Sequence, residues 1–139
     1  GLALATMIKS SGLASWLAQN FSLLNAWPLF AVVLVIVTVI IFLTEITSNT
    51  ATTATFLPLL GALAVAQSVS PMLFVVPAAI AASCAFMMPV ATPPNAVVFG
   101  SGELRIKDMM HAGFLLNLFG IGLVSILGYY IVLAVFITR

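Results

Sequence analysis

The sequence predicts an all-α integral membrane protein with an interfacial helix, a re-entrant helical hairpin, a broken transmembrane helix and a final transmembrane helix. Hydrophobic residues make up 63% of the 139 residues and charged residues 5%, whereas charged residues usually make up about 25% of a soluble domain. A polar stretch at residues 44–50 and a proline-rich stretch at residues 91–95 interrupt the apolar runs. Four basic and three acidic side chains cannot cover a soluble domain of this length, so the composition excludes one.

We predict four consecutive segments along the chain. The first is an interfacial or linker helix, because polar residues alternate with apolar ones at helical spacing and tryptophans, which favour the membrane interface, flank its end. The sequence begins Gly-Leu-Ala-Leu without Met, so we expect a piece of a longer protein. The segments are residues 1–26 for this helix, 27–67 for the hairpin with its Ser-Asn-Thr tip, 68–110 for the broken helix with a charged loop, and 111–139 for the final helix.

The hairpin prediction depends on two apolar runs that are each too short to cross a membrane. Residues 28–43 and residues 51–66 are runs of about 16 residues, or about 24 Å as helices, against a hydrocarbon core of about 30 Å. Between them lies the polar sequence of residues 44–50. Polar side chains and irregular backbone at membrane depth are tolerated where they are buried in protein or line a cavity. Two short arms with a polar tip therefore favour a re-entrant hairpin.

The broken helix is predicted from consecutive prolines within apolar sequence. Residues 67–71 form a surface turn, and the apolar residues that follow end at Ala91-Thr92-Pro93-Pro94-Asn95. Two adjacent prolines remove two backbone donors and disfavour helical backbone before them, so we expect the helix to unwind at residues 91–95. The charged residues 103–108 predict a water-facing loop, and the positive-inside rule places that loop in the cytoplasm.

The final segment is the clearest membrane span. It contains Gly113, Gly120, Gly122 and Gly128, and we expect these glycines to permit close contact with other helices. Asn117 is the strongly polar residue within it.

The two interruptions predict a transport site rather than an enzyme or a nucleic-acid-binding surface. Unwound backbone exposes carbonyl groups that can coordinate Na⁺, and the free N–H groups of the following half-helix attract an anion. The sequence has no basic patch, no metal-ligand cluster for zinc or iron, and no evident Ser-His-Asp arrangement. Three structural interpretations stay open. Ser48-Asn49-Thr50 can be only a helix cap, the proline break can be only a kink, and Glu45 can hydrogen-bond the tip backbone rather than carry a proton or pair with a cation.

Two motifs resemble those of a known family. Ser48-Asn49-Thr50, with its flanking residues, resembles the Ser-Asn-Thr signature of the divalent anion/sodium symporters, which are dicarboxylate and citrate transporters. The sequence of residues 88–96 resembles the second motif of the same family. The resemblance covers essentially the whole chain and identifies it as the C-terminal half of such a transporter. It implies a homodimer, two inverted repeats that each contribute one Ser-Asn-Thr hairpin, and elevator-type transport coupled to Na⁺.

The resemblance also implies the roles of individual residues. At Thr47 the family often has a small residue such as Ala, and a main-chain ligand survives that change. The sodium-binding positions, largely through backbone carbonyls, are Thr44, Thr47, Asn49 and Ala91. The substrate-binding positions are Asn49, Thr50, Thr92 and Pro93.

We therefore expect a sodium-coupled symporter of di- or tricarboxylates such as succinate, in a bacterial inner (plasma) membrane. Its expected partners are the lipid bilayer, a small dicarboxylate or related anion, a second protomer and the N-terminal half of the same transporter, since one tip is half of a dianion site. Two alternatives stay open. One is an exchanger or proton-coupled relative of the same fold, and the other is a structural membrane subunit that does not transport.

Overall fold

The computed structural model describes residues 7, 10–12, 16 and 27–137. The predicted interfacial helix of residues 1–26 therefore lies almost wholly outside the described residues. Within them the chain is all-helical and has no strand, which confirms the predicted class. The helices are α3 (Leu29–Thr44), α4 (Asn49–Ala66), α5 (Met72–Ala81), α6 (Pro93–Gly100) and α7 (Ile106–Val132), and α7 continues into the π-helical turn η2 (Leu133–Ile137).

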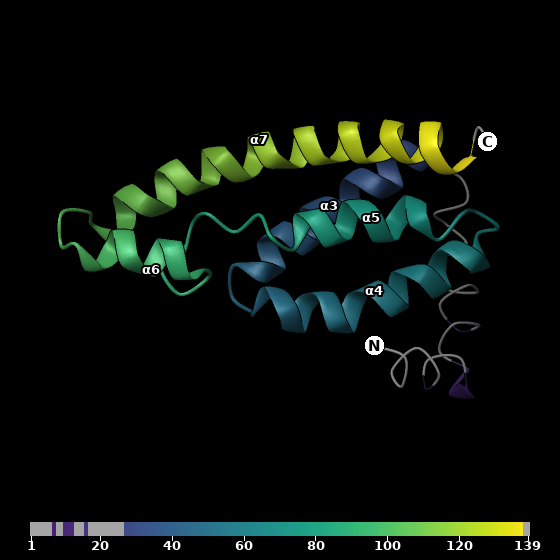
Figure 1. The fold of residues 1–139 in the computed structure, drawn as a ribbon, viewed down its shortest axis with the longest axis horizontal. Coiled ribbons are helices and arrows are strands. Elements are labelled where there is room, and N and C mark those ends of the chain that lie inside the picture. The colour runs from purple at the N-terminus through teal and green to yellow at the C-terminus, as the bar shows by residue number, and fades with distance from the viewer. Residues whose placement is uncertain (1–6, 8–9, 13–15, 17–26, 138–139) are drawn as a thin grey trace.

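Helix α5 is the centre of the packing. It contacts α3, α4 and α7, and α7 also packs along α3. Figure 1 shows α7 as the longest element, with α3 and α5 between it and α4. The core lies among these four helices and consists mainly of branched aliphatic side chains with Phe74. Burial of this apolar surface holds the helices together at about 25 cal/mol per Å² of area removed from water.

The hairpin arms lie where the hydropathy places them. Helices α3 and α4 have 16 and 18 residues and are joined by residues 45–48. The two arms have few contacts with each other, and α5 packs against both (Figure 1). The hairpin is therefore an open one whose arms are held together by a third helix.

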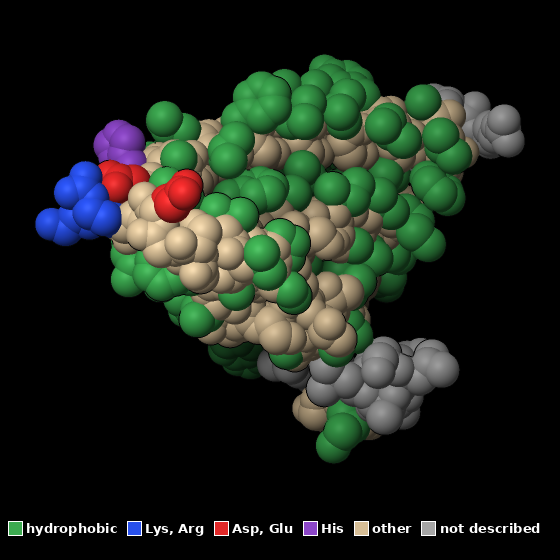
Figure 2. Space-filling model, turned by 60° about the vertical axis from the view of Figure 1, so that its left-hand side comes forward, with side chains coloured by type: hydrophobic (Ala, Val, Ile, Leu, Met, Phe, Trp, Pro, Cys, Tyr) green, Lys and Arg blue, Asp and Glu red, His purple; other side chains and the backbone are tan. Residues whose placement is uncertain are grey.

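The outer surface is apolar, as a membrane protein requires. Helix α4 and the continuous helical segment Ile106–Phe136 are long and apolar enough to cross a membrane, whereas α3 and α5 are shorter. Figure 2 shows hydrophobic side chains over most of one face and charged side chains gathered at one end. These charged residues belong to residues 103–111, most of which are exposed and where Arg105 pairs with Asp108 at 2.9 Å.

The break in the predicted broken helix, between α5 and α6, begins earlier than the two prolines indicate. Helix α5 ends at Ala81 and α6 begins at Pro93, so residues 82–92 are not helical. The prediction of unwinding at residues 91–95 is therefore wrong in its position. Pro93 and Pro94 occupy the first turn of α6, where the N–H group that proline lacks would have no helical partner in any case.

Two of the four α7 glycines allow close packing. A Cβ atom at Gly113 would overlap the backbone of Phe86 and Met87. At Gly128 it would lie 2.9 Å from the Pro77 side chain of α5. At Gly120 it would make an ordinary contact, and at Gly122 it would meet nothing within 4 Å. The prediction for all four glycines thus holds for Gly113 and Gly128 and is wrong for Gly122.

We expect Gly113→Ala to destabilise the folded protein by about 1–3 kcal/mol, because the added methyl group forces α7 away from the break. Gly122→Ala is the matched control in the same helix. It meets open space and replaces glycine by a better helix former, so it should be neutral or stabilising by up to about 1 kcal/mol. Thermal unfolding of the purified protein in detergent measures both changes. Equal unfolding temperatures for the two variants would contradict the close contact at Gly113.

Candidate functional site

The tip of the hairpin exposes the first backbone donors of α4. The Ser48 hydroxyl accepts a hydrogen bond from the Ala51 N–H at 3.1 Å and caps the helix. Within the described part of the chain, the N–H groups of Asn49 and Thr50 have no acceptor. Because these groups lie at the positive end of an 18-residue helix, they are suited to contact an anion.

Threonine hydroxyls fix the shape of the tip. The Thr44 hydroxyl lies 2.7 Å from Asn49 Oδ1 and 2.9 Å from the carbonyl oxygen of Ala82. Thr47 donates to the Leu43 carbonyl at 2.8 Å and lies 2.6 Å from the Thr52 hydroxyl. Thr44 has one hydroxyl proton and donates to one acceptor at a time. When it donates to Ala82, the Asn49 amide can turn its nitrogen toward Thr44 and its oxygen away from it.

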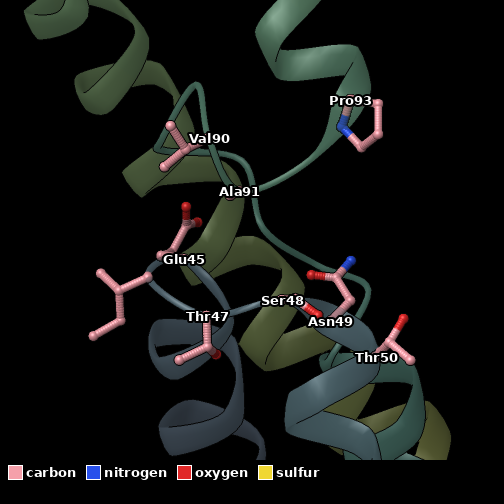
Figure 3. A pocket seen from close by; sticks show the side chains of 9 residues that line it. Glu45, Thr47, Ser48, Asn49, Thr50, Val90, Ala91 and Pro93 are labelled. Atoms are coloured by element: carbon pink, nitrogen blue, oxygen red, sulfur yellow. The ribbon is translucent and has the colours of Figure 1, made fainter.

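The tip and the break face each other across a cavity of about 450 Å³. Figure 3 shows residues 45–50 on one side of this cavity and Val90, Ala91 and Pro93 on the other. The cavity walls therefore come from two segments that are more than one helix apart in the sequence. The lining residues are Glu45, Ile46, Thr47, Ser48, Asn49, Thr50, Val90, Ala91 and Pro93.

Most residues expected to bind sodium or substrate line this cavity, and two do not. The side chain of Thr44 is fully buried behind the tip, where it makes the contacts described above. The Thr92 hydroxyl accepts a hydrogen bond from the Asn95 N–H at 3.4 Å and caps α6. The expected residues that line the cavity are Thr47, Asn49, Thr50, Ala91 and Pro93.

Glu45 binds the unwound backbone of the break. Its side chain is 4% exposed, and its carboxylate accepts hydrogen bonds from the N–H groups of Phe86, Met87 and Met88 at 2.8–3.1 Å. The Asn117 side-chain amide also donates to it, at 2.7 Å. These bonds support the option that Glu45 hydrogen-bonds the backbone. The backbone that it bonds is that of the break, however, and not that of the tip. Successive N–H groups turned to one side form an anion-binding nest, and here that nest holds a carboxylate of the same chain.

Asn95 binds the same segment through its carbonyl groups. Its side-chain nitrogen donates to the carbonyl oxygens of Ala85 at 2.9 Å and Met88 at 3.0 Å. Glu45 and Asn95 together supply partners that the helix would otherwise provide, so the break has a defined shape. No role was predicted for Asn95 or Asn117, although both are amide side chains within apolar sequence, which is a signal of a buried polar contact.

Several carbonyl oxygens near the cavity are free to bind a cation. Those of Thr44 and Thr47 on the tip, and of Ala91 on the break, accept no hydrogen bond from any described residue. Glu45 is the charged side chain among the lining residues, and N–H donors already surround its carboxylate. An anion in this cavity would therefore be held by neutral donors and by a bound cation.

Comparison with known proteins identifies related transporters. Residues 1–136 match the model of the sodium:sulfate symporter transmembrane region. The sodium-dependent dicarboxylate transporter SdcS of Staphylococcus saprophyticus is 51% identical over 132 residues, which are 95% of this chain and 25% of that protein. The protein of the same name from Staphylococcus aureus strain MRSA252 is 49% identical over 131 residues, or 94% of this chain and 25% of that protein.

The chain spans about a quarter of the length of these curated relatives. It therefore corresponds to part of such a transporter, and the resemblance to the family is confirmed. The relatives are transporters and not enzymes, as expected from the sequence.

We expect Asn95→Leu to destabilise the protein by about 1–3 kcal/mol, because two carbonyl groups of the break lose their donor while the number and branching of the side-chain heavy atoms are kept. Ser101→Ala is the control. Ser101 is exposed next to the same short helix, and its hydroxyl bonds only within its own turn, so its loss should change stability by less than about 0.5 kcal/mol. Unfolding temperatures in detergent compare the two. A Leu variant as stable as the control would show that Asn95 does not hold the break.

Proposed function

This chain belongs to the sodium:sulfate symporter family, and we propose that it carries one of the two tips of a sodium-coupled symporter for dicarboxylates such as succinate. The observation behind this proposal is the cavity of about 450 Å³ between the Ser-Asn-Thr tip and the break. It combines free carbonyl oxygens with free N–H groups at a helix start. These are the two kinds of group that transporters use to bind a cation and an anion together.

Sodium is proposed to bind on the side of the cavity nearest the end of α3. Its ligands would be the carbonyl oxygens of Thr44, Thr47 and Ala91 together with Asn49. Neutral oxygen ligands suit a hard monovalent cation. Thr47 contributes its carbonyl group, since its hydroxyl already bonds Leu43 and Thr52.

The substrate is proposed to bind at the start of α4. Asn49 and Thr50 offer free N–H groups and a polar side chain each, and Pro93 forms the opposite wall. Thr92 lies between two lining residues, Ala91 and Pro93. No lysine or arginine lines the cavity, so the bound sodium ion supplies positive charge for one carboxylate. Binding of sodium and binding of the substrate are then coupled, because the substrate carboxylate needs the charge of the sodium ion.

The hairpin is proposed to re-enter the membrane without crossing it. Helix α3 has 16 residues, which correspond to about 24 Å against a core of about 30 Å. Helix α4, which is joined to it by residues 45–48, would therefore begin inside the membrane and return to the side from which α3 entered. In this arrangement residues 27–67 form the hairpin, residues 68–110 the broken helix and residues 111–139 the last span.

The complete transporter is proposed to be a homodimer in the bacterial plasma membrane that works by an elevator-type movement. The N-terminal half supplies the second tip and completes the dianion site, because one tip offers donors for one end of a dicarboxylate. The relatives named above are sodium-dependent dicarboxylate transporters of Staphylococcus, which supports this substrate class and this membrane.

The geometry of Glu45 weighs against a proton-coupled relative of the same fold. Its side-chain oxygens already accept hydrogen bonds from the backbone of the break and from Asn117, which is a structural role. A dicarboxylate exchanger would use the same cavity. A structural subunit would not need the unpaired donors and acceptors that face each other here.

We expect Asn49→Ala and Thr50→Ala each to reduce sodium-dependent succinate uptake by at least about tenfold, since each removes a polar group of the tip. The measurement is uptake of radiolabelled succinate by the full-length transporter in proteoliposomes, with and without a sodium gradient. Thr55→Ala, an exposed threonine on the same helix, is the matched control and should keep full uptake.

The results separate the three hypotheses. Uptake driven by sodium and lost in the two tip variants supports the symporter. Uptake that requires succinate on the opposite side and ignores sodium supports the exchanger. Unchanged uptake in both tip variants would overturn the assignment of the site, and wild-type protein that moves no succinate would leave the structural subunit.

A further inference from the structure

We propose that Asn117, which does not line the cavity, is a positioning residue for the transport site. It acts through Glu45, which hydrogen-bonds the backbone of residues 86–88 in the break. The residues that follow in the break form one wall of the cavity. The inference rests on the proposed function, because its effect is measured on sodium-dependent uptake. It assigns to the last helix a part in ligand affinity that the lining residues alone do not reveal.

The contact between Asn117 and Glu45 has a defined orientation. Asn117 is fully buried on α7, and its amide nitrogen lies 2.7 Å from Glu45 Oε1. An ionised carboxylate only accepts hydrogen bonds, so the amide must turn its nitrogen and not its oxygen toward it. The Asn117 oxygen then has no partner among the described residues. A buried unpaired acceptor costs stability, which indicates that the nitrogen contact decides the position of this side chain.

The effect of Asn117 reaches the cavity through a short chain of contacts. Glu45 accepts from the Phe86, Met87 and Met88 N–H groups. Val90, two residues after Met88, and Ala91 line the cavity. One helical turn before Asn117, Gly113 lets α7 approach the backbone of Phe86 and Met87. The same face of α7 therefore touches the break directly and fixes the carboxylate that holds it.

The position of the Glu45 carboxylate is set by neutral N–H donors, so the loss of the Asn117 donor is expected to change that position. No described residue forms an ion pair with Glu45. Of its four donors, three are backbone groups of the break itself, and Asn117 is the one from outside the break and the hairpin. Without Asn117, the carboxylate and the break can move together relative to α7. The binding-competent geometry is then less populated, and apparent affinities fall in proportion.

The first experiment uses Asn117→Leu, which keeps the number and branching of the side-chain heavy atoms and removes the donor. We expect the KM for succinate and the half-saturating sodium concentration to rise about tenfold, the loss that one hydrogen bond to a charged group can produce. The maximal rate per folded transporter should change much less. Ser125→Ala is the control on the same helix, because Ser125 is equally buried and its hydroxyl has no partner in the described structure. It should leave both constants unchanged.

The second experiment uses Asn117→Ala and also decides the case in which the Leu variant does not fold. The Ala variant removes the donor to Glu45 without placing a larger side chain between α7 and the break. We expect the KM for succinate and the half-saturating sodium concentration to rise in the same direction as in Asn117→Leu, relative to the Ser125→Ala control.

The outcomes distinguish failure of this inference from failure of the proposed function. If the wild-type full-length protein shows no sodium-dependent succinate uptake, the proposed function fails and with it the basis of the inference. If the wild-type protein transports and Asn117→Leu lowers only the amount of folded protein, with unchanged KM, Asn117 has a structural role and the inference is wrong. An unchanged KM for Asn117→Ala would overturn it as well.

Discussion

The backbone of residues 82–92 must find hydrogen-bond partners without forming a helix, and the rest of the structure follows from this constraint. An unpaired backbone group costs free energy wherever water is excluded. Glu45 satisfies three N–H groups and Asn95 satisfies two carbonyl groups of this segment. Because Glu45 ends one hairpin arm and Asn95 lies in the helix that follows, the same bonds bring the tip and the break to the two sides of one cavity.

Helix α7 completes this arrangement through two kinds of residue. Gly113 and Gly128 allow its backbone to approach the break and α5, which a larger side chain would prevent. Asn117 then reaches the carboxylate at the centre of the hydrogen bonds. The small residues determine the distance between the helices and the amide determines their register. Close packing and polar contacts thus act on the same face of one helix.

The features that depend on local sequence could be predicted, and those that depend on distant partners could not. Apolar run length and the Ser48 cap place the hairpin arms and the tip at their observed positions. The early start of the break could not be predicted, because nothing local ends α5 at Ala81. The N–H groups of Phe86, Met87 and Met88 bond Glu45 instead, 41 to 43 residues earlier in the sequence. For the same reason the sequence left open whether Glu45 hydrogen-bonds the tip backbone, carries a proton or pairs with a cation, and it predicted close contact for all four glycines of α7.

The separation of Asn117 from Glu45 also has a consequence for biogenesis. The two residues are 72 positions apart, and the chain emerges from the ribosome N-terminal end first. The hairpin and the broken helix are therefore synthesised before their last hydrogen-bond donor exists. Pairing of Glu45 with the break can begin at that stage, while the final shape of the cavity waits for α7 to enter the membrane. A nascent chain interrupted before α7 would have the residues that line the cavity and would lack the helix that fixes their positions.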